Sequence, residues 1–396
     1  MLCICIKERL VIDVKLQVKY KKPGMADCEI VIRAKGFLMA MLYWSVENTP
    51  LSGWSSMAAL PLDASGKGYF RFEGNRGIPP EATHLYARCI TPDYSRIEDV
   101  AEKIPDAFRT PQKNTPAMFT ASVMSDLHLS GKSGKIESAI QGVQCDTVLL
   151  VGDLVNDGYP EQFALLKKCI EERIPYKILL SVTGNHDQLF SSASEAAERE
   201  NSYELFQEYL LCRARKQGIR IENGPCGAYM AYVGNVGIIG LQCVDGNRNF
   251  VFSKGGQLEW LRERLAHGTG WHIILCHAPL LKHNPQRNDG KPYLDKNREL
   301  QEIIDSNEKI IFISGHTHAS PNRLKSSVEC TFDNRVVYMN DGSVTPTDLA
   351  GEILTPAEWK DGVRMELSLW EDQLEIRTKS VHTGICYPRG YYRFCL

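Results

Sequence analysis

Five short segments of the sequence carry aspartate, asparagine or histidine side chains directly after an apolar run. They are SDLH (125–128), GD (152–153), GNHD (184–187), His277 and GHTH (315–318). Carboxylate, amide and imidazole groups together are ligands that suit Mn, Fe, Zn or Ni, and they form a softer set than Mg or Ca sites use. The pattern therefore predicts a metal site assembled from several separate segments.

The apolar runs predict the elements that position these side chains. They are MFTASVM (118–124), TVLLV (147–151), ILLSVT (178–183), HIILC (272–276) and KIIFIS (309–314). Runs of this length, bounded by glycine or polar residues, are typical of buried strands in a mainly parallel sheet. Ligands of open α/β sheets bind at the carboxyl ends of the strands. We therefore expect the five segments to converge on one edge.

Spacing within the segments suggests how the ligands are presented. Asp126 and His128 are two residues apart, as are His316 and His318. On an extended segment, residues two apart point the same way. Asp153 ends its own run, and its two carboxylate oxygens could bridge two cations. Two ions about 3.5–4 Å apart can activate a water and hold the attacking and leaving oxygens of a phosphate ester.

The GNHD segment adds groups that could act on a substrate. Asn185 offers a neutral carbonyl oxygen as a ligand, and His186 should project differently from it. His186 is therefore better placed to hydrogen-bond the substrate or to protonate the leaving oxygen than to bind metal. Asp187 is a candidate to orient that imidazole and to raise its pKa by accepting its other N–H.

The segments SDLH, GDLVNDG, GNHD, CHAP and GHTH, in this order, resemble the motifs of the calcineurin-like metallophosphoesterase superfamily over about residues 118–345. The resemblance implies one metal held by Asp126, His128, Asp153 and His318. It implies a second metal held by the bridging Asp153 with Asn185, His277 and His316. It further implies a metal-bridging hydroxide as the nucleophile, with His186 as the catalytic histidine that assists the leaving group. The turn Asn340–Ser343 resembles the family's Asn-x-Gly-Ser turn, which implies a structural role beside the site.

The segments GD, GNHD and GHTH are most similar to the cyclic-nucleotide and related phosphodiesterase branch. The resemblance implies two divalent or trivalent transition metal ions and a small phosphodiester or phosphomonoester substrate. Asn185 and His186 are the expected substrate-binding residues. The polar loop 282–297 could add Arg287 or Lys291 as a phosphate contact, although a solvated surface loop is the alternative.

Purple acid phosphatases are a second branch with a similar order of domains. In that branch the first motif ends in glycine, and a tyrosine ligand lies three residues after the bridging aspartate. Here His128 and Asn156 stand at those positions. A tyrosinate-bound ferric ion is therefore not expected.

The chain should contain two domains, because 396 residues exceed the usual size of a single core. Residues 25–112 contain short β-rich runs separated by turn residues, which predicts a small all-β sandwich of fibronectin or immunoglobulin type. Residues 113–396 alternate apolar runs with helical patterns, as in α/β folds. The resemblance implies four layers there, a β-sandwich flanked by helices. Residues 1–24 read as an N-terminal extension or an exposed strand, with Met25 as an alternative start.

Bulk composition limits the partners and the compartment. A hydrophobic content of 43% and a net charge of -2 favour a globular protein without a stable nucleic-acid complex or a membrane partner. The 13 cysteines are scattered, which favours reduced thiols. The first 24 residues lack the features of a signal peptide, so the cytoplasm is the expected location.

Two other functions are alternatives to a phosphoesterase. A protein-interaction scaffold could keep this fold without turnover, but such proteins usually show eroded ligands. Here every motif residue is present, including His186, which favours the enzyme. Alternatively, the sandwich could bind a cell-surface partner while the second domain catalyses; the lack of a secretion signal argues against it.

Overall fold

The structure is a computed structural model of the chain. It describes residues 14–21, 25–72, 76–131, 134–188, 202–244, 249–252, 255–268, 270–284, 291–319, 328–331, 336–345 and 362–396. Contacts divide the chain into two compact units, Met1–Gln112 and Lys113–Leu396. None of the helices in the described ranges is long and apolar enough to cross a bilayer. No disulfide joins any two of the cysteines in these ranges.

The first unit contains two antiparallel sheets in its described residues. Its elements are β1 (Lys15–Tyr20), β2 (Cys28–Arg33), β3 (Met39–Val46), β4 (Thr49–Pro50), β5 (Ala58–Pro61), β6 (Lys67–Phe72), β7 (His84–Ile90), β8 (Ile97–Lys103) and the 3-10 turn η1 (Asp106–Phe108). One sheet has the order β1-β2-β6, and the other has β4-β3-β7-β8 with β5 beside β3. In β6, successive side chains point to opposite faces of the sheet, so that Phe70 and Phe72 are buried while Tyr69 and Arg71 are exposed.

Part of the predicted N-terminal extension, Lys15–Tyr20, is strand β1. β1 pairs along its whole length with β2, from Lys15 opposite Arg33 to Tyr20 opposite Cys28. Leu16 of β1 is buried in the apolar core of the unit. In the same core, the rings of Trp44 and Phe72 pack edge to face with their centroids 6.1 Å apart. Lys15–Tyr20 thus belongs to the first sheet of this unit, and the expected start of the sandwich at residue 25 omits it.

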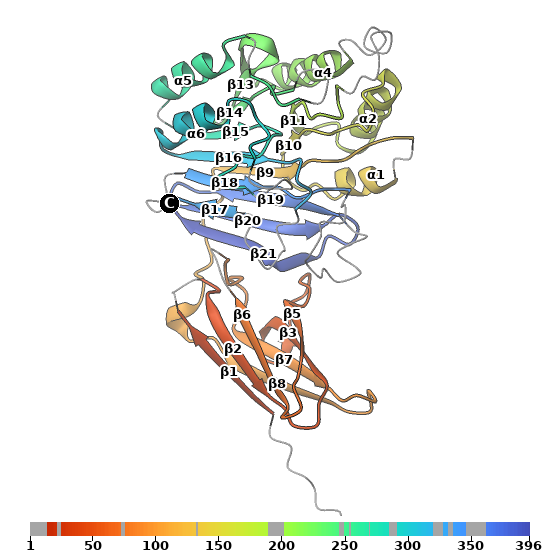
Figure 1. Cartoon of the computed structure of the whole chain (residues 1–396), viewed down its shortest axis with the longest axis vertical. Coiled ribbons are helices and arrows are strands. Elements are labelled where there is room, and N and C mark those ends of the chain that lie inside the picture. The colour runs from red at the N-terminus through yellow and green to blue at the C-terminus, as the bar shows by residue number, and fades with distance from the viewer. Residues whose placement is uncertain are drawn as a thin grey trace, which may run out of the picture. The chain divides into compact units, whose positions relative to one another are not determined.

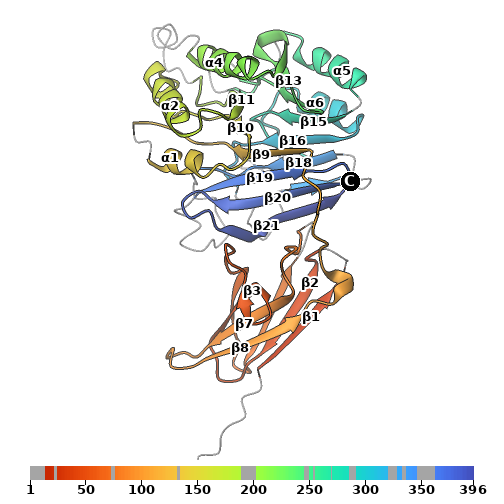
Figure 2. The ribbon, with the colours of Figure 1, turned by 180° about the vertical axis from the view of Figure 1, so that it is seen from behind.

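The second unit contains two larger sheets and five described α-helices (Figures 1 and 2). Its first sheet has the order β11-β10-β9-β19-β20-β21. These strands are β9 (Phe119–Met124), β10 (Thr147–Val151), β11 (Ile178–Val182), β19 (Val363–Leu369), β20 (Gln373–Ser380) and β21 (Cys386–Cys395). β9, β10 and β11 are parallel, and β19 joins β9 in the antiparallel sense.

The second sheet has the order β12-β13-β14-β15-β16-β18-β17. These strands are β12 (Arg220–Asn223), β13 (Tyr229–Val233), β14 (Val236–Gly240), β15 (Trp271–Leu275), β16 (Ile310–Ser314), β17 (Val328–Cys330) and β18 (Val336–Asn340). β14, β15, β16 and β18 are parallel neighbours. β13 and β14 form a hairpin around Gly234 and Asn235.

Three apolar cores join these elements into layers. One core lies between the two sheets. A second lies between the first sheet and α1 (Gly134–Gln141), α2 (Pro160–Arg173) and α4 (Ser202–Lys216). The third lies between the second sheet and α5 (Gln257–His267) and α6 (Asn297–Asp305). The helices thus cover the two outer faces (Figure 1). The 3-10 turn η2 (Pro225–Gly227) precedes β13. Because the central strands are buried on both faces, they read as continuous apolar runs.

Some details differ from the predictions. The five apolar runs are strands, but they belong to two sheets rather than one, with three in the first and two in the second. β18 is parallel to β16 and antiparallel to β17. α6 was not predicted, because its sequence follows a polar loop without a strong capping signal.

Candidate metal centre

The loops after five strands bring the predicted ligands together in an unusual backbone conformation. Asp126, His128, Asp153, His316 and His318 all have φ between 47° and 67°. Non-glycine residues rarely adopt this left-handed region, which costs of order 1–3 kcal/mol each and is frequent at functional sites. Because these segments are not extended, the reasoning from an extended strand does not apply to them. Asp126 and His128 nevertheless lie in one cluster, as expected, whereas His316 and His318 lie in different clusters.

Two motif glycines are required by close approach of these loops. A Cβ atom at Gly184 would lie 2.1 Å from the backbone nitrogen of Asp153 and 2.2 Å from its Oδ1. A Cβ atom at Gly152 would lie 2.6 Å from the ring of His277, and Gly152 has φ of 83°. Each glycine thus lets one ligand-bearing loop pack directly against another.

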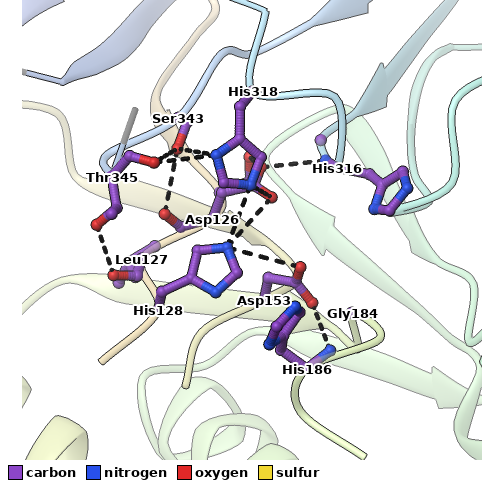
Figure 3. A network of polar contacts seen from close by, with 12 residues as sticks. Asp126, Leu127, His128, Asp153, Gly184, His186, His316, His318, Ser343 and Thr345 are labelled. Atoms are coloured by element: carbon purple, nitrogen blue, oxygen red, sulfur yellow. Dashed lines mark hydrogen bonds and ion pairs between the residues drawn. The ribbon is translucent and has the colours of Figure 1, made fainter. Parts of the chain in front are cut away.

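The first cluster contains Asp126, His128 and His318, whose candidate ligand atoms lie within 4.8 Å of one another (Figure 3). Nε2 of His318 is 3.0 Å from Oδ1 of Asp126 and 3.2 Å from Nε2 of His128. The other carboxylate oxygen of Asp126, Oδ2, accepts hydrogen bonds from the backbone N–H of His316 and the hydroxyl of Ser125. One oxygen of Asp126 is thus held by the chain, and the other faces the cluster.

The second cluster contains Asp153, His277 and His316. Oδ2 of Asp153 is 3.3 Å from Nε2 of His277 and 3.8 Å from Nε2 of His128, so this oxygen lies between the two clusters. Oδ1 accepts the backbone N–H of His186 at 2.7 Å (Figure 3). Oδ2 of this carboxylate therefore faces both clusters, while Oδ1 is held by the chain.

Hydrogen bonds at Nδ1 determine the tautomers of two histidines. Nδ1 of His277 lies 2.6 Å from the carbonyl oxygen of Val151, and Nδ1 of His318 lies 3.0 Å from that of Thr345. A carbonyl oxygen only accepts, so Nδ1 carries a proton in both rings. In a neutral ring, Nε2 then presents a lone pair toward a carboxylate oxygen. Such an arrangement requires a proton or a metal ion between the two atoms, and metal-bound histidines are commonly held in this way.

Buried atoms without hydrogen bonds also fit a metal. Within the described residues, no hydrogen bond reaches Oδ1 of Asp126, Oδ1 of Asn185 or Nε2 of His277. Asp126 and His277 have no exposed surface, and Asn185 is 7% exposed. Leaving such groups unpaired is costly. All three are predicted ligands, and the set fits two transition metal ions of mixed imidazole and carboxylate coordination.

Electrostatics in the metal-free site follow from the same contacts. Burial disfavours the charged forms, but the neighbouring histidines, first His318, outweigh burial and lower the pKa of Asp126 to about 2. At His277, Asp153 likewise outweighs burial and raises the pKa to about 10. Burial lowers the pKa of His128 to about 4. The metal-free site therefore holds carboxylates together with a protonated His277.

His186 lies beside both clusters without the partner that was expected for it. Its ring centroid is 4.6 Å from that of His128, and its Nδ1 donates to the carbonyl oxygen of Asn156 at 2.8 Å. Nε2 is therefore the nitrogen that does not take part in this hydrogen bond, and His186 also forms a third group of candidate ligand atoms with His128 and Asp153. The expectation that Asp187 orients this imidazole is wrong. Asp187 is 2% exposed and accepts three backbone N–H groups, those of Leu154, Val155 and Gly184, at 2.8–3.0 Å.

Other side chains at the site were not predicted. The rings of Phe250 and Tyr293 meet the His316 ring nearly perpendicularly, at 4.8 and 4.6 Å. Tyr293 belongs to the polar loop 282–297, whose Arg287 lies outside the described residues. Asn340 accepts from Thr317 and donates to the carbonyl of Gly315, so the predicted turn holds the GHTH segment.

Comparison with known proteins agrees with this arrangement. A sequence profile described as calcineurin-like phosphoesterase matches residues 120–320, just over half of the 396 residues. No curated protein sequence matches the chain significantly. A purple acid phosphatase from yellow lupin (Lupinus luteus) seeds is 12% identical over 96% of this chain and 73% of its own, with a TM-score of 0.48. PhoD is 12% identical over 96% of this chain and 88% of its own, with a TM-score of 0.42.

A predicted phosphoesterase from Streptococcus pneumoniae is 13% identical over 70% of this chain and 98% of its own, with a TM-score of 0.33. No conclusion is drawn from structural similarity at these TM-scores, so the family assignment rests on the profile and its extent. The chain belongs to the calcineurin-like phosphoesterase family.

Proposed function

We propose that this protein is a metal-dependent hydrolase of a small phosphate ester, either a diester or a monoester. The proposal rests on one contact in each cluster between a histidine nitrogen and an aspartate oxygen. Nε2 of His318 and Nε2 of His277 each face a carboxylate oxygen, at 3.0 and 3.3 Å, while each Nδ1 proton is donated elsewhere. This geometry is suited to cations placed between the facing atoms.

Two transition metal ions would be held by seven residues. Asp126, His128, Asp153 and His318 would hold one, and Asp153, Asn185, His277 and His316 would hold the other. When bound, such ions polarise a phosphoryl oxygen and lower the pKa of a bound water. Mn, Fe, Zn and Ni all suit these ligands.

The chain's own groups would orient the reaction. Because Asp153 Oδ1 accepts the backbone N–H of His186, this bond ties the bridging carboxylate to the GNHD loop. The Asn156 carbonyl fixes the His186 ring through Nδ1, so that a protonated Nε2 can donate to a phosphate oxygen or to the leaving oxygen. Phe250 and Tyr293 pack around His316 and limit the motion of that ring.

The proposal is tested by hydrolysis of bis(4-nitrophenyl) phosphate and 4-nitrophenyl phosphate. Metal-stripped protein is reloaded singly with Mn, Fe, Zn or Ni, and Asp153→Ala serves as the inactive control. Metal-dependent release of nitrophenolate that Asp153→Ala abolishes is the expected result, and the preferred ester assigns the substrate class. Absence of turnover with all four metals, in protein that binds two ions, would contradict the proposed activity.

A further inference from the structure

Asp341 is linked to the first cluster through Ser125 and has no place in the proposed reaction. It occupies the variable position of the turn Asn340–Ser343, and it is 1% exposed. Its backbone N–H bonds to the carbonyl of Ser314 at 3.0 Å, which anchors it beside β16. Its Oδ1 lies 2.7 Å from Oγ of Ser125, and its Oδ2 has no hydrogen bond within the described residues.

Ser125 has more acceptors around it than one hydroxyl can satisfy. Its Oγ lies within hydrogen-bond distance of Oδ2 of Asp126, of Oδ1 of Asp341 and of the carbonyl oxygen of Gly342 at 3.2 Å. A serine hydroxyl donates one proton and can accept others. The Gly342 carbonyl cannot donate. At least one of the two carboxyl groups must therefore carry a proton.

The surroundings show which carboxyl group is protonated. Asp126 accepts the N–H of His316 at Oδ2, and its Oδ1 lies 3.0 Å from His318, so its anion is well supported. Asp341 has one side-chain contact and an unbonded buried oxygen. An anion in that position would be costly. Burial, and then the charge of Asp126, raise the pKa of Asp341 well above its usual value.

We propose that Asp341 is a neutral carboxylic acid that donates to Ser125, which in turn donates to Oδ2 of Asp126 and so aligns Oδ1 toward a metal ion. Asp341 is thus a positioning residue that acts through Ser125. The inference rests on the proposed function, because it concerns a ligand of the first metal. The close packing of Gly315 fits this chain of bonds, since a Cβ atom there would lie 2.6 Å from Oγ of Ser125.

Infrared spectroscopy tests the proton directly and needs no metal. The spectrum of the wild type near neutral pH should contain the carbonyl stretching band of a protonated carboxylic acid. The difference spectrum against Asp341→Asn should assign that band to Asp341. A wild-type spectrum without such a band would overturn the donor role.

Metal titration tests the alignment of Asp126. Asp341→Leu and Ser125→Ala should each weaken binding of Mn or Zn by roughly 10–100-fold, the range for loss of a partner that orients a ligand. Asp341→Asn, which keeps a donor, should bind nearly as tightly as the wild type. Because both residues act in one chain, the double variant should lose no more than either single variant.

Ser122→Ala is the matched control. Ser122 is buried in the same strand region, and its Oγ makes no hydrogen bond within the described residues. The Ser122→Ala variant should bind metal with the same affinity as the wild type. If Asp341→Leu binds metal as tightly as the wild type, the positioning role is overturned while the proposed function stands. A wild type that binds no metal would instead contradict the proposed function and leave the infrared result to decide the state of Asp341.

Discussion

Oδ2 of Asp153 lies 3.3 Å from Nε2 of His277, and both side chains are buried at the junction of the two sheets' loops. The two residues come from different sheets, since Asp153 follows β10 and His277 follows β15. The carbonyl of Val151, at the end of β10, fixes the ring by accepting from Nδ1. The site therefore requires both sheets of the second unit, because neither sheet supplies both ligands.

Replacement of Asp153 should affect both metals at once. Asp153→Asn keeps the size of the side chain but removes the charge that faces His128 and His277. We expect metal affinity and kcat/KM to fall by more than about 100-fold, beyond the loss typical of a residue that only orients a ligand. Isothermal titration and steady-state kinetics measure the two quantities. If only one ion is lost and the other binds normally, Asp153 is not the bridge.

The metal-free protein should lose stability as the pH rises from neutral. The folded pKa of His277 is raised to about 10, above the value of about 6.5 for an unfolded chain. Its stabilising contribution is therefore complete below pH of about 6.5 and disappears as the pH approaches 10. Urea unfolding of the metal-free wild type and of His277→Gln across this pH range measures this contribution. The difference in the free energy of unfolding between the two proteins should shrink with rising pH. A constant difference would contradict the ion pair of His277 with Asp153.

Metal binding should strengthen over the same pH range. A metal ligand must be deprotonated, so a metal ion has to displace the proton of His277. The affinity for Zn should rise with pH, and protons should be released on binding. Titration calorimetry in two buffers of different ionisation enthalpy counts these protons. Binding without proton release at pH 7 would show that His277 is already neutral.

His186 should matter for turnover more than for metal content. His186→Gln removes the ring whose Nε2 is left for the substrate, and kcat should fall by about 10²–10⁴-fold. Metal stoichiometry should remain unchanged. The loss should be larger for a methyl ester than for a nitrophenyl ester, because the poorer leaving group depends more on proton donation. A variant that loses one metal would identify His186 as a ligand instead.

Asp187 should contribute to stability rather than to proton transfer. Asp187→Ala leaves the backbone N–H groups of Leu154, Val155 and Gly184 without their acceptor, and each such group costs about 1–3 kcal/mol. Urea unfolding of metal-free protein should show this loss. The stability of Asp187→Asn should lie between that of Asp187→Ala and that of the wild type. Its one carbonyl oxygen can still accept the backbone N–H groups of Leu154 and Val155. Unchanged stability of Asp187→Ala would contradict the role.

Much of the site could be predicted because its signals are local. Each ligand follows a run such as TVLLV or HIILC, and these runs are strands because both of their faces are buried. The glycines beside Asp153 and Asn185 are also local signals, since packing between loops excludes a Cβ atom there.

The errors concern features that depend on tertiary structure. The left-handed conformation of His316 and His318 accompanies the placement of the two rings in different clusters. Their spacing alone does not reveal this, although the family resemblance assigned the two residues to different metals. The partners of Asp187 are backbone groups of another loop, and so a sequence neighbour was wrongly preferred. The contact of Asp341 with Ser125 joins residues 216 positions apart.

The most direct test of the central claim follows turnover as metal is added. Metal-stripped wild type and Asp153→Ala are titrated with Mn, and hydrolysis of the preferred nitrophenyl ester is measured at each step. The wild type should reach full activity at two equivalents of metal per chain, and Asp153→Ala should remain inactive throughout. Activity that is complete without metal, or that Asp153→Ala retains, would contradict a dinuclear metallophosphoesterase.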